Sequence, residues 1–287
     1  MVSHPYAELH AHSYFTFLEG ADAPEDYILC ARQLGLSALA LLERDGMYSL
    51  IRSLQAARES SFPLIIGTEL TLSATQFSRY DAKASIGTPG WGLPCGWEDT
   101  GIRLPILTTS RDGYRDLCSL MSERTLEDAD GENPSHGLEN IAENAQDIRI
   151  LTGGPRGPLR RILHAQGRNQ ADRFLNDLIS LFGRERIIVE SVLRPGEDDM
   201  GAELADLAHK HQLPLAATGS VTMASPGSKY RADLLCALRQ SKSLDEIRYL
   251  LPAQHSFLKS AEEMLALHRR APQAVSNAAG IARECYY

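Results

Sequence analysis

Seven short apolar runs recur along the chain, and this repeat constrains the fold more than any other feature of the sequence. Patterns typical of helices separate most of the runs, which begin at Tyr6, Ala38, Leu64, Leu104, Ile148, Arg186 and Leu213. Strands that alternate with helices are typical of α/β proteins with a parallel sheet. Seven such units predict a βα barrel, and 287 residues, of which 43% are hydrophobic, are enough to build one.

One long segment interrupts this rhythm. Residues 74–101 are rich in Gly, Pro and Trp and contain the stretch GTPGWGLPCGW. Such a composition predicts an excursion from the barrel and not a linker between domains. Because the sequence shows no internal repeat or low-complexity tract, we expect a single domain over residues 1–287.

Composition also indicates the cellular compartment and the kinds of partner to expect. The formal net charge of -8 argues against a free-standing nucleic-acid binder, which normally carries a basic face, so contact with DNA is expected to be indirect. The five cysteines are scattered and form no C-x-x-C pair, as is typical of a reducing compartment. No signal peptide or apolar run of membrane-spanning length is visible, which predicts a cytoplasmic protein with no membrane partner.

Two histidines in the stretch LHAHSYFTFLEG form the sharpest candidate site. Alternate side chains of a strand share one face, so His10 and His12 point the same way, with Glu8 on that face too. Neutral imidazoles suit zinc, manganese or iron, and Glu69 adds a carboxylate at the end of an apolar strand. These side chains suffice for one mononuclear metal site. The alternatives are two partly exposed histidines at a barrel rim and a glutamate that caps a helix or joins a salt bridge.

Several stretches together resemble one known family. The stretches YAELHAHSYFTFLEGA, GLSALALLERDGMYSLI and IIGTELTL resemble the amino-terminal polymerase-and-histidinol-phosphatase (PHP) domain of bacterial C-family DNA polymerases. The similarity is to the error-prone type of DNA polymerase III alpha subunit, and further matches cover nearly the whole chain in order. The resemblance implies a distorted seven-stranded (βα)7 TIM-like barrel, which agrees with the seven apolar runs.

The resemblance also implies a set of metal ligands, of which only part is present. Metal-binding members of the family hold two or three ions, and the matching positions that keep a ligand are His10, His12, Glu19 and Glu69. Five ligand positions have changed, because Arg44 and Arg103 stand where the family has histidines, Gly154 where it has cysteine, and Ser220 and Thr222 at its closing Asp-x-His. The resemblance therefore implies a degenerate site that binds no cofactor, or else zinc or manganese at a reduced site. The excursion could supply further metal ligands, such as Asp81 or Asp99.

An arginine cannot replace a histidine as a ligand, because its guanidinium stays protonated and offers only hydrogen-bond donors. We therefore predict that Arg44 and Arg103 supply positive charge that the lost metals once supplied, by pairing with Glu19, Glu43 or Glu69. The alternatives are a solvated loop residue for Arg44 and the end of a variable segment for Arg103.

The stretch GGPRGPLRRIL offers a second, weaker binding site. Backbone N–H groups at a helix start can hold a phosphate, with Arg156 and Arg160 nearby. The stretch lacks the P-loop and dinucleotide patterns, so a plain loop before a helix is the alternative.

Two functions follow from these residues. The first is a non-catalytic PHP domain that binds a polymerase core or other replisome or repair-synthesis proteins, as the resemblance implies. The second is a metal-dependent phosphoesterase or 3′-5′ exonuclease that uses His10, His12, Glu19 and Glu69. An unrelated barrel enzyme would need another constellation at the strand ends, and the sequence shows none.

Overall fold

The computed structural model describes residues 5–73, 76–77, 101–127, 135–247 and 255–287. Within them the chain forms eight strands in two sheets, ordered β1-β2-β3 and β4-β5-β6-β7-β8. Their bounds are β1 Glu8–Ala11, β2 Leu39–Leu41, β3 Leu64–Ile65, β4 Gly67–Leu72, β5 Ile102–Thr108, β6 Ile148–Leu151, β7 Ile187–Val192 and β8 Leu215–Thr218. Each of the seven apolar runs overlaps a strand, and the run at Leu64 overlaps both β3 and β4.

The strands are not all parallel. The three-stranded sheet is parallel throughout, as are the pairs β6–β7 and β7–β8. Strand β5, however, runs antiparallel to both β4 and β6. The expectation of a parallel sheet was therefore wrong for β5. A strand that begins near the end of β4 can pair with it directly only in the antiparallel direction, because a parallel pair needs a crossover to the opposite end of the sheet.

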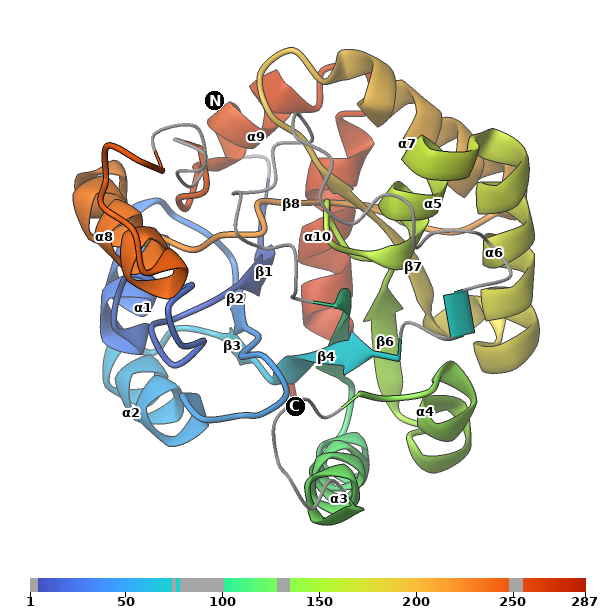
Figure 1. The fold of residues 1–287 in the computed structure, drawn as a ribbon, viewed down its shortest axis with the longest axis horizontal. Coiled ribbons are helices and arrows are strands. Elements are labelled where there is room, and N and C mark those ends of the chain that lie inside the picture. The colour runs from blue at the N-terminus through green and yellow to red at the C-terminus, as the bar shows by residue number, and fades with distance from the viewer. Residues whose placement is uncertain (1–4, 74–75, 78–100, 128–134, 248–254) are drawn as a thin grey trace.

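Two short bridges join the sheets at or just beyond the ends of β1 and β2. On one side Ala11 pairs with Val221, and the backbone N–H of His12 donates to the Val221 carbonyl at 2.8 Å. On the other side Arg44 pairs with Glu69, flanked by a hydrogen bond of 2.9 Å from the Asp45 N–H to the Glu69 carbonyl. The strands thus lie in a ring (Figure 1), but the described residues form no closed barrel, so the seven-stranded barrel stays a prediction.

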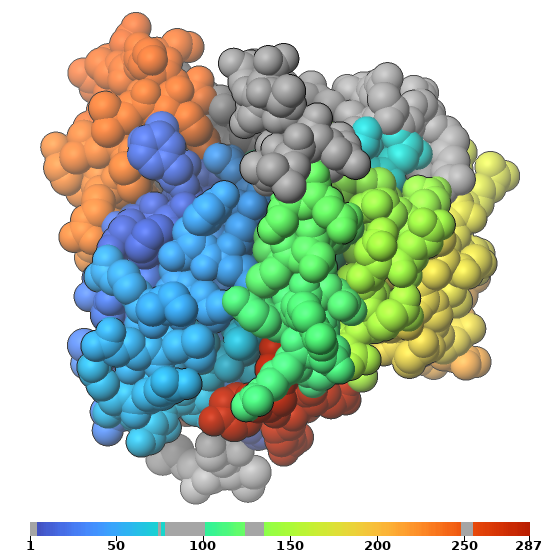
Figure 2. All heavy atoms as spheres, turned by 90° about the horizontal axis from the view of Figure 1, so that it is seen from below, coloured from blue at the N-terminus to red at the C-terminus, as the bar shows by residue number. Residues whose placement is uncertain are grey.

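Helices surround the strands (Figure 1). Apolar side chains of strands and helices form one large buried core. Helix α10 packs against β1 and β8, and on the face seen in Figure 2 α2 and α3 lie side by side with the C-terminal residues next to α3. The helix bounds are α1 Pro24–Gln33, α2 Leu50–Ser60, α3 Arg111–Glu127, α4 Leu138–Asn144, α5 Pro158–Gln166, α6 Arg168–Phe182, α7 Asp198–His211, α8 Lys229–Gln240, α9 Ala261–Leu267 and α10 Gln273–Glu284, with short 3-10 turns η3 Arg184–Arg186 and η4 Pro226–Ser228.

The predicted excursion over residues 74–101 falls almost wholly outside the described residues, and with it Asp81 and Asp99. The single domain over residues 1–287 therefore stays a prediction. Within the described residues, every helix is too short or too polar to span a lipid bilayer.

Candidate functional site

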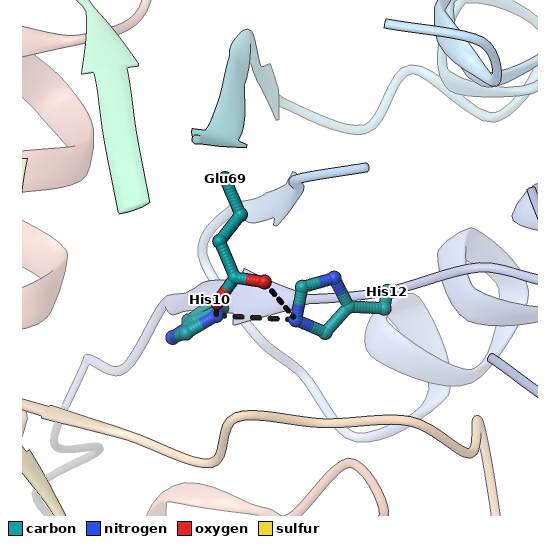
Figure 3. Close-up of side chains that lie close together, drawn as sticks. All are labelled: His10, His12 and Glu69. Atoms are coloured by element: carbon teal, nitrogen blue, oxygen red, sulfur yellow. Dashed lines mark hydrogen bonds and ion pairs between the residues drawn. The ribbon is translucent and has the colours of Figure 1, made fainter. Parts of the chain in front are cut away.

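His10 and His12, at the end of β1, lie together with Glu69 of β4 (Figure 3). All three side chains are buried, and one ligand atom from each lies within 4.8 Å of the others, close enough for a single metal ion. His10 Nε2 is 3.1 Å from Glu69 Oε1 and 3.2 Å from His12 Nε2. His12 Nδ1 is buried and has no hydrogen-bond partner. By distance these three side chains fit one ion, and no other such group occurs among the described residues.

Both ring nitrogens of His10 have carboxylate neighbours. Its Nδ1 lies 2.7 Å from Glu190 Oε1, so a carboxylate faces each ring nitrogen. Burial opposes a charge on His10, but Glu190 and Glu69 outweigh it and raise the pKa of His10 to about 10. Burial lowers the pKa of His12 to about 4. The two carboxylates therefore favour the protonated form of His10, and burial favours the neutral form of His12.

Glu190, on β7, was missed by the sequence analysis. The Thr218 hydroxyl donates to its Oε1, and its backbone N–H donates to Thr152 Oγ1 at 3.0 Å. The available signal was a single acidic residue inside the apolar run RIIVES. Its link to His10 spans 180 positions, and no local pattern reveals it.

Glu19 is the centre of a second cluster, which we call the Glu19 cluster. Its buried carboxylate is approached by guanidinium groups of Arg44 at 2.7 Å, Arg156 at 2.9 Å, Arg239 at 3.5 Å and Arg103 at 3.7 Å. Burial would raise the pKa of Glu19, but Arg156, Arg103 and Arg44 hold it below its usual value. Sequence analysis had proposed Arg44 and Arg103 as partners of the retained acids but assigned no such role to Arg156 and did not consider Arg239.

Arg103 connects the two clusters. It lies on β5, is only 2% exposed, and its Nη1 is 3.6 Å from Glu69 Oε2 while its Nη2 approaches Glu19. The guanidinium therefore lies beside the carboxylate that would have to bind a metal. A cation at this place repels a divalent ion and stabilises the ionised form of both glutamates.

Glu43, the third acid predicted as a partner, has no ion pair with an arginine of the described residues. The hydroxyls of Ser13 and Thr16 each donate to its carboxylate at 2.5 Å. Burial raises the pKa of Glu43, and these hydrogen bonds only partly oppose the effect. Arg44 and Arg103 thus contact Glu19, and Arg103 also Glu69, but neither contacts Glu43.

The remaining predicted residues divide between a small cavity and the protein interior. A cavity of about 40 Å³ is lined by Glu19, Arg156, Arg239, Ser220 and Thr222. Gly154 lies at its edge, where an added Cβ would come within 2.8 Å of Val192 Cγ2, so a cysteine at that position would force a shift. Arg160, proposed with Arg156 as a phosphate ligand, instead binds Glu197 at 2.6 Å and the Val192 carbonyl.

The chain belongs to the PHP domain family, whose model matches residues 8–192. An error-prone DNA polymerase of Nocardia farcinica (strain IFM 10152) is 33% identical over 99% of this chain and 27% of its own length. An error-prone DNA polymerase of Mycolicibacterium paratuberculosis (strain ATCC BAA-968 / K-10) is 34% identical over 99% of this chain and 25% of its own. The chain therefore spans about a quarter of the length of these relatives.

Solved structures give weaker matches. A candidate metal-dependent phosphoesterase from Bifidobacterium adolescentis aligns with a TM-score of 0.47 and 16% identity, over 75% of this chain and 87% of that chain. A histidinol phosphate phosphatase from Lactococcus lactis aligns with a TM-score of 0.39 and 14% identity, over 82% and 93% of the two chains. At these scores the matches carry no argument about the site.

Proposed function

We propose that this chain serves as the PHP module of an error-prone type of DNA polymerase III alpha subunit, with a structural and partner-binding role in DNA replication or repair synthesis. In this module, ion pairs between side chains would occupy the positions at which metal-binding members of the family hold their ions. The observation that carries the proposal is the Glu19 cluster, in which four arginines among the described residues surround one buried carboxylate.

Electrostatics supports a degenerate metal site. At ~6 Å from a guanidinium such as that of Arg103, a divalent ion would be repelled by about 5 kcal/mol with an effective dielectric of ~20. Before it could act as a ligand, His10 would also have to lose the proton that Glu190 and Glu69 stabilise. Both effects weaken the binding of a single ion at His10, His12 and Glu69. They weaken the binding of a cluster of ions even more.

The proposal extends to architecture and setting. The two sheets and the bridges between them support a distorted seven-stranded barrel, counted with β3 and β4 as one interrupted strand, in a single domain. The partners would be a polymerase core or other replisome or repair-synthesis proteins of the cytoplasm, since the curated relatives are polymerases about four times as long. With a net charge of -8, contact with DNA would be indirect.

Elemental analysis of protein purified without chelator tests this proposal. We expect substoichiometric metal in the parent chain, before and after addition of manganese or zinc, and no change in His10→Ala/His12→Ala. The variant Arg44→His/Arg103→His returns two ligand side chains and removes two cations, so it should take up metal. Stoichiometric metal in the parent that is lost in His10→Ala/His12→Ala would contradict the proposal.

A second candidate function is phosphoester hydrolysis at a reduced site. It is favoured by the three ligand atoms of His10, His12 and Glu69 within 4.8 Å. A bound ion would activate water for attack on phosphorus, and Arg156, beside the small cavity, would orient the phosphate. Hydrolysis of p-nitrophenyl phosphate and of single-stranded DNA, with added manganese or zinc, tests it. A metal-dependent rate that disappears in His10→Ala/His12→Ala would establish this function in place of the first.

A further inference from the structure

A second, larger cavity lies outside both charged clusters. It is formed by the loop after β7, residues 255–259 and α9, and its volume is about 390 Å³. Volumes of roughly 300–1,000 Å³ are typical of sites for small molecules. We call it the Lys259 groove. It shares only Arg194 with the cavity beside Glu19.

Lys259 is the unusual residue of this groove, because its ammonium is buried and forms no ion pair with any other described residue. The residue is 6% exposed, and its ammonium donates to the backbone carbonyls of His255 and Phe257, the latter at 3.1 Å. The ammonium also lies 4.5 Å from the centre of the Phe257 ring. An ammonium has three hydrogens to donate, and these carbonyls accept two of them. A buried charge normally has a partner of opposite charge, because its removal from water is costly.

The carboxylates that line the groove already have other partners. Asp198 pairs with Arg269, whose Nε lies 3.1 Å from Asp198 Oδ1. Glu263 Oε2 accepts the backbone N–H of Ser260 at 2.8 Å in the capping box at the start of α9. Asp198 and Glu263 are thus engaged by Arg269 and by the start of α9, and neither forms an ion pair with Lys259 within the described residues.

Apolar groups cover the walls around this charge. Phe257, Pro195 and Leu267 line the groove, and the Phe257 ring lies directly beside the ammonium. A ligand that combines an anionic group with a flat apolar body would satisfy both features, since the anion neutralises the buried cation and the body covers the ring.

We propose that the Lys259 groove binds a small organic anion, with a phosphate or carboxylate group at Lys259 Nζ and an apolar or aromatic body against Phe257, Pro195 and Leu267. No metal and no residue of the Glu19 cluster takes part. The inference is thus independent of the function proposed above, and either can fail without the other.

Isothermal titration calorimetry of the 287-residue chain tests the proposal with phenyl phosphate, benzoate and inorganic phosphate as probes. We expect saturable binding of phenyl phosphate or benzoate, and the tighter of the two identifies the anionic group. Lys259→Met, which keeps an apolar stem without the charge, should weaken that binding by about tenfold or more. Lys259→Arg should retain it within about threefold, and Lys242→Met, a change of an exposed lysine outside the groove, should leave it unchanged.

Two further results decide the proposal if Lys259→Met fails to fold. Phe257→Leu leaves the backbone carbonyls in place but removes the ring. It should therefore weaken the binding of the aromatic probe by at least about threefold, without affecting the binding of inorganic phosphate. The proposal is overturned if no probe saturates up to ~10 mM, or if a folded Lys259→Met binds as tightly as the parent.

Discussion

Two kinds of buried acid lie near the carboxyl ends of the strands, and they differ in what faces them. Of the described residues, four arginines face Glu19, whereas the hydroxyls of Ser13 and Thr16 face Glu43. Although both are buried, the pKa of Glu19 lies below its usual value and that of Glu43 above it. Burial therefore does not decide the ionisation of these acids. The formal charge of the neighbouring groups decides it.

Glu69 and Glu8, which both lie beside His10, differ in pKa in the same way as Glu19 and Glu43. Burial of Glu69 is outweighed by His12, His10 and Arg103, which hold its pKa well below its usual range. Burial raises the pKa of Glu8, although the Gly219 N–H, the Tyr6 hydroxyl and the His10 N–H all donate to it and the charge of His10 also lowers it. These donors and this one charge do not offset the burial of Glu8.

The largest expected effect is that of Glu19→Gln. This change leaves buried guanidinium groups without their carboxylate, and removing one partner of a buried ion pair costs roughly 3–5 kcal/mol. Urea denaturation at pH 7 should show a fall of about 4 kcal/mol in the free energy of unfolding. A fall below ~1 kcal/mol would contradict the view that the Glu19 cluster holds this end of the molecule together.

A pH series sharpens the comparison at His10. The pKa of His10 is raised from 6.5 to about 10 in the folded chain. The contribution of protonated His10 to the stability of the fold is therefore complete below about pH 6.5 and is lost as the pH rises through 10. We expect the free energy of unfolding to fall by ~3 kcal/mol between pH 7 and pH 10. In Glu190→Gln, which removes the first carboxylate partner, this pH dependence should be much reduced. An equal slope in the two proteins would show that other groups cause it.

Glu43→Gln should have a smaller effect than Glu19→Gln. The amide oxygen can still accept from Ser13 or Thr16, and no cation is left behind, so the expected loss is at most about 1 kcal/mol. The same urea titration measures it. A loss as large as that of Glu19→Gln would mean that the hydroxyls stabilise the ionised carboxylate as strongly as arginines do.

The smallest effect is expected for the exposed pair Arg52–Glu25. Arg52 Nε lies 2.7 Å from Glu25 Oε1, as close as Arg44 lies to Glu19, but both side chains of this pair are about half exposed. Water and salt screen such a pair, so Glu25→Gln, which keeps the contacts of Arg52 with Tyr14 and Phe15, should leave the urea midpoint essentially unchanged. A clear shift of the midpoint would show that distance, and not burial, determines the strength of these pairs.

Local patterns predicted a large part of the fold and part of the candidate site. Each apolar run overlaps a strand, because a short apolar run is a property of neighbouring residues only. His10 and His12 share a face for an equally local reason, but their contact with Glu69 joins positions 59 apart and is tertiary. The direction of β5 and the break between β3 and β4 were not predicted, since they depend on which distant strand offers hydrogen-bonding partners.

The sequence by itself determined the chemical groups available at the strand ends, namely two histidines, several acids and the arginines that replace expected ligands. Only the tertiary structure decided which of them pair. It brought Glu190 to His10 across 180 positions and Arg239 to Glu19 across 220, and it left Glu43 with hydroxyls. The physical reason is that the energy of a buried charge depends on all charges within a few ångströms, and chain neighbours supply only some of these.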